Sequence, residues 1–374
     1  MNEIPHWILS ELSDEIRKRA EEIISEKKFE NKLFGKHALT QEERELLERI
    51  LEIYELTIID LWDKEEKKNE FSTLSKKCFD ILQILPLPQD DISKIKHILK
   101  LVAYSYLGEK WEDGRRFLKE EKNTCEIEIN DENTWDERLF KKTYLAILYL
   151  VRKDSWEDLS NAVNLINELR DEQKKYEEEY LKSVETEFKK GAALELASFY
   201  HFAKSIEILG RFMLEGEPSS DRVTSEIDYH LNKGIKFCDL SGNFEFSLIL
   251  RLMLAMFKKM VFNSIWRVSE RINSKITSFV KHITKASKPV YELLYPQRAA
   301  ILEMGLLDPA SRGIVVNLPT SSGKTLIAEF KILQALNQFE NGWIAYVVPT
   351  RALVNQITNR LRIDLGNDLS LIHI

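Results

Sequence analysis

Apolar residues recur at three- and four-residue spacing through most of the first two-thirds of the chain, as in helices that bury one face. No proline lies between Pro88 and Pro218, and proline is poorly tolerated inside helices. Several of these stretches follow a Ser or Thr with an acidic residue three positions later, as at Thr40, Thr134 and Ser155. The pattern therefore predicts a mostly α-helical N-terminal region.

Short breaks divide this helical region. The loop at residues 215–220 separates two blocks, which predicts an acidic helical domain over residues 1–217 and a helical subdomain over 218–288. Successive amphipathic stretches between residues 192 and 265 suit an α-solenoid, whose units stack to bury their apolar faces. Because no clean internal period accompanies them, an irregular helical bundle is the alternative.

The pattern changes after Lys288. Two apolar runs, residues 313–318 and 343–348, are typical of strands, and a stretch of helical period follows each of them. This order predicts the start of a parallel sheet flanked by helices, and so an α/β domain over residues 289–374. Sheets of this kind usually have about five strands, so we expect the domain to be incomplete and the chain to be the front of a longer protein. Residues 369–374 fit either a third strand or a non-native end.

Charge divides the chain into three environments. Residues 1–250 carry 38 basic and 53 acidic side chains, residues 251–288 carry nine basic and one acidic, and residues 291–374 carry seven of each. Cations interleaved with aromatic residues, as in the basic segment 251–288, are typical of surfaces that bind nucleic acid. The alternative is that the aromatic residues belong to the core and the cations face water. The acidic region has no recognisable group of catalytic residues. Its charged helix faces either only face water or, as the more specific hypothesis, dock another protein.

Other classes of protein are disfavoured. Cys78, Cys125 and Cys238 lie far apart without paired histidines, so we expect reduced core thiols and neither a disulfide framework nor a zinc site. The N-terminus lacks the basic and apolar regions of a signal peptide, and two lysines interrupt the most apolar stretch, residues 248–265. We therefore expect a cytoplasmic protein without a membrane segment.

The strongest chemical signal is the sequence Leu-Pro-Thr-Ser-Ser-Gly-Lys-Thr at residues 318–325, between a predicted strand and a predicted helix. Backbone N–H groups in such a loop cradle phosphates, Lys324 can neutralise β- and γ-phosphate charge, and the Thr325 hydroxyl can reach Mg²⁺. An incidental surface lysine does not account for this context. The predicted ligands of a nucleoside triphosphate are Thr320, Ser321, Ser322, Gly323, Lys324 and Thr325, of which Lys324 and Thr325 are the catalytic candidates.

Two further motifs flank this loop in order. Upstream stands Leu-Tyr-Pro-Gln-Arg at residues 294–298, and downstream the second predicted strand ends in Pro-Thr-Arg-Ala-Leu at residues 349–353. Together the three segments resemble motifs Q, I and Ia of superfamily 2 DExD/H-box helicases, over residues 291 to about 366. The resemblance implies a RecA-like P-loop lobe, ATP and Mg²⁺ as cofactors, and Gln297 as the contact to adenine.

The same resemblance assigns nucleic-acid contacts. It implies that Thr350 and Arg351 hold the phosphodiester backbone of DNA or RNA, which would make binding independent of base sequence. The alternative for Arg351 and Asn355 is that they only cap and solvate a helix. A P-loop enzyme unrelated to nucleic acid is disfavoured by residues 349–353.

The chain also departs from the family pattern. Leu318 and Ser321 stand where many members have a smaller residue, and neither the acidic DExD/H motif nor an arginine finger follows within the sequence. Without these groups phosphoryl transfer lacks its metal-holding acid and its charge stabilisation. We therefore expect the isolated chain not to hydrolyse ATP.

A large helical region in front of such motifs resembles antiphage-defence helicases like the helicase subunit of the Hachiman system. The first interpretation is thus an ATP-dependent nucleic-acid helicase or translocase, active as a full-length protein. The alternative is a regulatory interaction protein, whose helical region restrains an effector such as a nuclease while the loop acts as a nucleotide switch.

Overall fold

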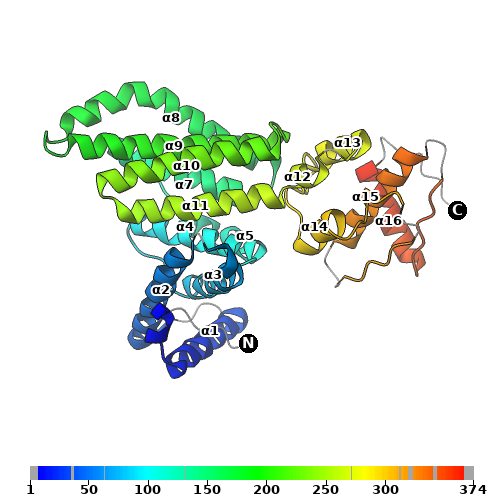
Figure 1. The fold of residues 1–374 in the computed structure, drawn as a ribbon, viewed down its shortest axis with the longest axis horizontal. Coiled ribbons are helices and arrows are strands. Elements are labelled where there is room, and N and C mark those ends of the chain that lie inside the picture. The colour runs from blue at the N-terminus through cyan, green and yellow to red at the C-terminus, as the bar shows by residue number, and fades with distance from the viewer. Residues whose placement is uncertain are drawn as a thin grey trace. The chain divides into compact units, whose positions relative to one another are not determined.

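Figure 1 shows the computed structural model, which describes residues 7–34, 38–62, 64–130, 132–270, 272–310, 313–318, 323–339 and 343–365. Apart from one β-bridge, the regular secondary structure in these ranges is helical. In chain order the elements are η1 (Trp7–Glu11), α1 (Asp14–Phe34), α2 (Gln41–Leu61), η2 (Glu65–Lys67), α3 (Lys68–Leu82), α4 (Asp91–Leu107), α5 (Trp111–Glu120), α6 (Lys122–Cys125), α7 (Trp135–Arg152), α8 (Trp156–Ser183), α9 (Lys189–Glu215), α10 (Ser220–Ser241), α11 (Phe244–Asn263), α12 (Ile265–Ser269), α13 (Ser274–Ile283), α14 (Tyr295–Leu302), α15 (Lys324–Gln338) and α16 (Arg351–Leu365).

The predicted helical character of the N-terminal region is confirmed, and local signals account for several helix ends. At the start of α2 the Glu43 N–H donates to Thr40 Oγ1 at 3.2 Å, and the Thr40 N–H donates to the Glu43 carboxylate at 2.9 Å. This reciprocal pair satisfies two N–H groups that the helix leaves open. Before α7, the Thr134 N–H donates to the Glu137 carboxylate at 3.3 Å.

Contacts divide the chain into two compact units. The first unit comprises Met1–Arg152, Leu165–Lys204 and Asp228–Lys259. The second unit comprises Lys153–Asn164, Ser205–Ile227 and Met260–Ile374. The long helices α8, α9, α10 and α11 each supply residues to both units, so the division does not fall at one point of the sequence.

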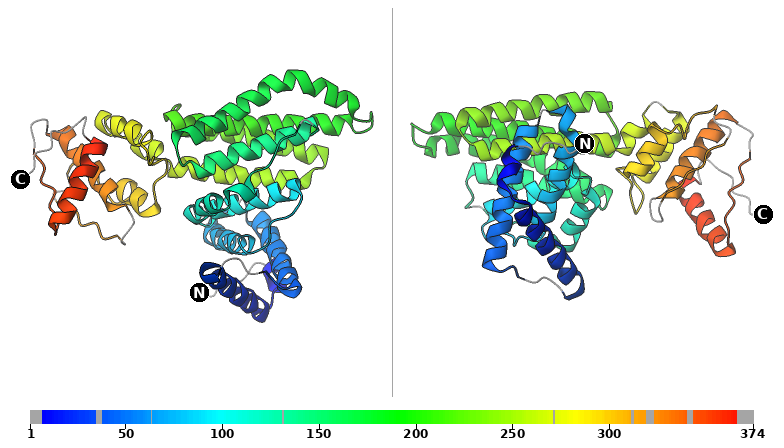
Figure 2. Two further views of the ribbon diagram at one scale, coloured as in Figure 1. Left: turned by 180° about the vertical axis from the view of Figure 1, so that it is seen from behind. Right: turned by 60° about the horizontal axis from the view of Figure 1, so that its bottom comes forward.

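In the first unit each early helix packs against its neighbour along the chain, from α2 through α5, and α4 and α5 pack against α7. Figure 2 shows this succession of helices from two further directions, with the same colours as in Figure 1. Phe140, Phe199 and Phe246 bring α7, α9 and α11 together, with ring centroids 4.5 to 5.9 Å apart. Packing between chain neighbours is common to solenoids and bundles.

One buried lysine of the first unit is matched to two carboxylates. Lys142 is buried, and its Nζ lies 3.1 Å from the Glu168 carboxylate and 2.8 Å from that of Glu172. Pairing matters here because a buried charge without a partner is strongly destabilising. All three cysteines are buried and free, which confirms the prediction of core thiols.

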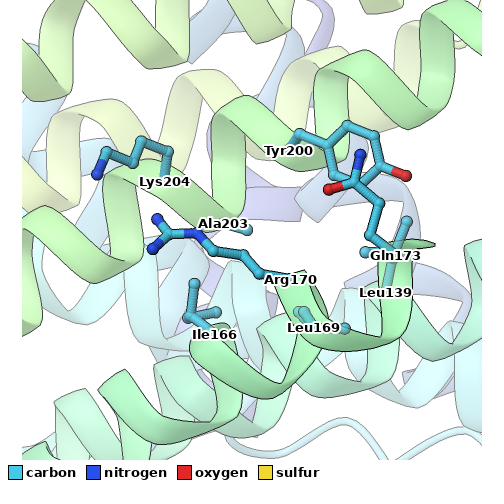
Figure 3. A pocket seen from close by; sticks show the side chains of 8 residues that line it. All are labelled: Leu139, Ile166, Leu169, Arg170, Gln173, Tyr200, Ala203 and Lys204. Carbon is cyan, nitrogen blue, oxygen red and sulfur yellow. The ribbon is translucent and has the colours of Figure 1, made fainter. Parts of the chain in front are cut away.

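A cavity of about 160 Å³ lies among α7, α8 and α9 of this unit (Figure 3). Its apolar lining comes from Leu139, Ile166, Leu169 and Ala203, with Arg170, Gln173, Tyr200 and Lys204 around it. The Tyr200 hydroxyl accepts a hydrogen bond from Trp135 Nε1 at 3.0 Å, which fixes the ring beside the cavity.

In the second unit α13 packs against α15 and α16, and α14 packs against α12 and α15. The Phe279 and Phe330 rings meet edge to face at 5.7 Å, and His282 Nε2 lies 2.8 Å from the Ile363 carbonyl oxygen. The predicted strands at 313–318 and 343–348 are non-helical but form no sheet among the described residues. Parallel sheets typically have both faces buried, whereas Val315 is 97% exposed.

The basic segment 251–288 buries most of its aromatic side chains. Phe257, Trp266 and Phe279 are only 0%, 8% and 1% exposed, whereas Phe262 is 37% exposed. The hypothesis that these rings stack on nucleic-acid bases is wrong for the three buried ones, because their faces are covered by the core.

Its cations are of two kinds. Three of them pair with acidic residues, as Arg251 with Asp239 at 3.3 Å, Lys258 with Asp228, and Lys259 with Glu109. Lys281, Lys285 and Lys288, on and after α13, have no carboxylate within ion-pair distance among the residues that the structure describes. The open positive charge is therefore smaller than the sequence count suggests.

In the described part of the chain, no helix combines the length and the apolar character that crossing a membrane requires.

The contact between Gly216 and Trp266 makes a testable prediction for the second unit. Gly216 has φ +73, and a Cβ there would lie 2.3 Å from the Trp266 ring, whose Nε1 donates to the Met213 carbonyl at 2.9 Å. We expect Gly216→Ala to destabilise the protein by about 3 kcal/mol, from the left-handed backbone and the overpacking together. The measurement is thermal or urea-induced unfolding.

Gly305→Ala is the matched control, because Gly305 also has positive φ (+68) but its Cβ would meet only Asp308 at 3.8 Å. We expect it to cost about 1 kcal/mol. Equal losses in the two variants would show that the indole does not constrain Gly216.

Candidate functional site

The predicted phosphate loop ends at Gly323, directly before α15. Gly323 has φ +69 and ψ 39, a left-handed conformation that glycine adopts without strain. A Cβ at this position would lie 2.1 Å from Gln297 Nε2. The backbone angle and the close approach therefore both require glycine here. Thr320, Ser321 and Ser322 lie outside the described residues.

Gln297 connects this loop to α14. Its Oε1 accepts the Leu294 N–H at 2.9 Å, and its Nε2 donates to the Gly323 carbonyl oxygen at 3.4 Å. The side chain is thus held by its own helix start and by the loop, and the residue is only 5% exposed. The structure brings together two predicted site residues that lie 26 positions apart in the sequence.

These two contacts leave part of the Gln297 amide available. A glutamine side chain offers two N–H donors and two acceptor lone pairs. One of each is used by Gly323 and Leu294. The amide therefore retains one donor and one acceptor on the same planar group.

Lys324 begins α15 and is exposed, and Thr325 follows it, partly buried. Lys324 lines a cavity of about 390 Å³ between α15 and the two extended segments, 313–318 and 343–348. Its lining also includes Ile314, Val316, Ile327, Ala328, Lys331, Ile344 and Tyr346. Apart from its two lysines, Lys324 and Lys331, this cavity is mostly apolar.

The second predicted contact segment starts α16. Thr350 Oγ1 accepts the Leu353 N–H at 3.3 Å, so Thr350 caps this helix. Its hydroxyl hydrogen can still be donated to another acceptor. Arg351, the first residue of α16, is exposed and has no carboxylate within ion-pair distance in the described ranges. Capping and readiness to bind an anion thus coexist at this helix start.

The positive side chains of α13 lie beside the opposite end of α16. His282 contacts the carbonyl of Ile363, twelve residues beyond Arg351. At a rise of about 1.5 Å per residue, about 18 Å of helix separates these two positions. Lys281 therefore does not directly extend the predicted nucleic-acid contact at Arg351.

Sequence reasoning missed a buried acidic pair between α15 and α16. Glu329 is fully buried, and Arg360 Nε lies 3.5 Å from its Oε1 while also contacting the Asp364 carboxylate. Burial, and then the neighbouring Asp364, raise the pKa of Glu329 to about 8. No sequence signal indicates this cluster, because Glu329 and Asp364 lie on separate helices and each resembles an ordinary surface acid.

Comparison with known proteins agrees with the three motifs. Residues 295–372 match the DEAD/DEAH box helicase family, and this match begins at the first residue of α14. The chain is similar to the Hachiman protein HamB of Bacillus cereus, with 29% identity over 126 residues, which cover 33% of this chain and 11% of HamB.

Two DNA helicases are similar to this chain over a shorter segment. The chain is 39% identical over 67 residues to the ATP-dependent DNA helicase Hel308 of Methanocella arvoryzae, covering 18% of this chain and 8% of that protein. It is 43% identical over 65 residues to Hel308 of Pyrococcus abyssi, covering 17% and 9% respectively. The chain therefore spans only a small part of these relatives, and its resemblance to superfamily 2 helicases is confirmed for this C-terminal segment.

The raised pKa of Glu329 predicts how stability depends on pH. The folded state keeps a proton that the unfolded state releases above its ordinary value of 4.5, so stability falls as pH rises from 4.5 to about 8. We expect Glu329→Gln to remove this fall and to gain on the order of 2 kcal/mol over wild type near pH 8.

Melting temperatures measured across this pH range test the expectation. Glu303→Gln, the same substitution at an exposed position of the same unit, should follow the wild-type profile. If Glu329→Gln also follows it, the buried carboxyl does not hold a proton.

Proposed function

We propose that this chain supplies the nucleotide-binding and nucleic-acid-binding part of an ATP-dependent helicase or translocase. The observation that carries the proposal is the contact between Gln297 and Gly323, which joins the first two helicase-like motifs. The helicase family match over residues 295–372 supports it independently. Both the whole-protein activity and the roles of individual residues belong to this proposal.

The chemistry of Gln297 favours adenine as the bound base. Adenine presents an N–H donor at N6 and an acceptor at N7 side by side, which a glutamine amide can pair with simultaneously. The donor and the acceptor that Gln297 retains have this complementarity. Gly323 and the neighbouring loop residues Thr320, Ser321 and Ser322 would receive the phosphates through backbone N–H groups.

Two side chains would complete the phosphate site. Lys324 is exposed at the start of α15, where both its charge and the positive end of the helix dipole favour an anion. Thr325 would contribute its hydroxyl to Mg²⁺, which typically takes few protein ligands and keeps phosphate and water oxygens. When bound, Mg²⁺ would offset the charge of the phosphates.

The exposure pattern of the extended segments supports a RecA-like lobe over residues 289–374. Ile314 and Val316 line the cavity against α15, whereas Val315 between them is 97% exposed. In the second segment Tyr346 lines the same cavity and Val347 is 89% exposed. This alternation has the two-residue period of a strand, in which successive side chains point to opposite faces.

Thr350 and Arg351 would hold the backbone of a nucleic-acid strand. A hydroxyl, a guanidinium and the open N–H groups of a helix start all suit phosphate oxygens and none of them reads a base. Two of the relatives are named ATP-dependent DNA helicases. DNA is therefore the first substrate to test. A cytoplasmic location is a separate part of the proposal.

Similarity to HamB favours a second candidate function in antiphage defence. That similarity extends over 126 residues and so exceeds the segment matched by the helicase family. In this candidate the helical region over residues 1–217 and 218–288 would dock and restrain an effector such as a nuclease. Nucleotide binding at residues 318–325 would then act as a switch.

Replacing Lys324 tests the nucleotide site. We expect Lys324→Ala to weaken binding of a fluorescent ATP analogue at least about tenfold, because a charge-assisted contact to phosphate is lost. Lys331→Ala is the control, since Lys331 lines the same cavity from the same helix. Equal affinities for wild type and Lys324→Ala, by fluorescence titration, would contradict the proposed phosphate contact.

Replacing Arg351 tests the nucleic-acid contact. We expect Arg351→Ala to weaken binding of single-stranded DNA for every sequence tried, and to lower the slope of log affinity against log salt by about 1. Arg362→Ala removes an equal charge near the other end of α16 and should have a smaller effect. Anisotropy titrations in which the two variants behave alike would argue against a specific contact at Arg351.

A further inference from the structure

The residue that follows Gln297 on α14 has a different neighbour. Arg298 is only 3% exposed, and its Nη1 donates to Asn263 Oδ1 at 2.5 Å. Asn263 is the last residue of α11 and is fully buried. Gln297 is thus held by the phosphate loop while the adjacent Arg298 is held by the end of a long helix.

Aromatic rings fix the Arg298 side chain further. Its guanidinium carbon lies 4.6 Å from the centroid of the Phe262 ring and 5.7 Å from that of Tyr295. A planar guanidinium is attracted to the face of an aromatic ring at such distances, most strongly where water is excluded. The hydrogen bond to Asn263 and the two rings together leave the Arg298 side chain little conformational freedom.

The backbone before α14 is bound to the same turn. The Ile265 N–H donates to the Tyr291 carbonyl at 2.9 Å, and the Leu293 N–H donates to the Asn263 carbonyl at 2.9 Å. Between these bonds, Ser264 and Glu292 form an antiparallel bridge. The segment that leads into Gln297 therefore has a fixed register against the end of α11.

A buried ion pair anchors this segment from another side. Glu292 and Lys153 form it, with side chains 0% and 1% exposed. Lys153 lies directly after α7, far from Glu292 in the sequence. Since breaking a buried pair leaves an uncompensated charge, this contact resists displacement of the segment.

We propose that Arg298 and Asn263 are positioning residues for the reading of the base by Gln297. This inference rests on the proposed function. Helix α14 has only eight residues, so it makes few hydrogen bonds of its own and its orientation depends on its anchors. Arg298 directly follows Gln297 in the chain. Releasing Arg298 from Asn263 therefore lets the backbone at Gln297 shift, and the Gln297 amide can turn away from a base held on the loop.

The proposal makes base selectivity depend on a helix outside the loop. By linkage, a base held by Gln297 then stabilises the arrangement at the end of α11, as much as that arrangement strengthens the binding of the base. The phosphate contacts of Lys324 and the loop do not depend on Asn263. The base and the phosphates can therefore be separated experimentally.

The test compares dissociation constants of fluorescent ATP and GTP analogues, each with Mg²⁺, for the 374-residue chain and its variants. We expect wild type to prefer ATP, and Asn263→Ala to lower that preference about tenfold with the affinity for GTP unchanged. In a Gln297→Ala background, Asn263→Ala should have no further effect on the preference, because it acts through Gln297.

Asn263→Asp is the conservative variant. Aspartate keeps the oxygen that accepts from Arg298, and the Asn263 Nδ2 that it removes has no hydrogen-bond partner among the described residues. We expect it to retain the preference for ATP. Gln334→Ala is the control for a general loss of packing, since its contact with Asn273 at 2.9 Å lies elsewhere in the same unit.

Phe262→Leu covers the case in which Asn263→Ala does not fold, and should lower the preference about threefold by removing one ring from the guanidinium. The proposal is overturned if Asn263→Ala or, where that variant does not fold, Phe262→Leu keeps the wild-type preference. Equal weakening of ATP and GTP, or a wild type without preference, also overturns it. A wild type that binds neither nucleotide overturns the proposed function as well, and so distinguishes the two failures.

Discussion

The candidate site depends on one steric constraint, the absence of a side chain at Gly323. The backbone there turns into the left-handed region at φ +69, and the Gln297 amide occupies the space that a Cβ would need. This single position lets the loop turn into α15, places Lys324 at the helix start, and brings α14 against the loop. Any other residue would strain the turn and displace the amide at the same time.

Local signals were readable from the sequence because each involves residues a few positions apart. Thr40 and Glu43 cap α2 as predicted, and the Gly-Lys-Thr sequence coincides with the start of α15. The helicase resemblance is confirmed by an independent family match for the same reason, since motifs are short and ordered. The individual site roles remain predictions, and the expected sheet is not formed among the described residues.

Contacts between distant positions were not readable. Nothing in the sequence indicates that Asn263 meets Arg298, or that Lys153 meets Glu292, because pairing of this kind is decided by tertiary packing. The composition of the basic segment was also misleading. It does not indicate that Phe257 and Phe279 are buried in the core, or that Lys258 and Lys259 have acidic partners. Composition reports which side chains are present and not which way they face.

The acidic cluster between α15 and α16 bears on how the two proposed contacts move together. Lys324 and Arg351 each begin one of these helices, and Arg360 of α16 contacts Glu329 of α15 as well as Asp364 of its own helix. Sliding one helix past the other would separate Arg360 from the buried Glu329 carboxyl, which costs free energy because a polar group that cannot reach water there would lose its partner. The helices therefore resist independent displacement, and a change at the nucleotide end of α15 would carry α16 with it.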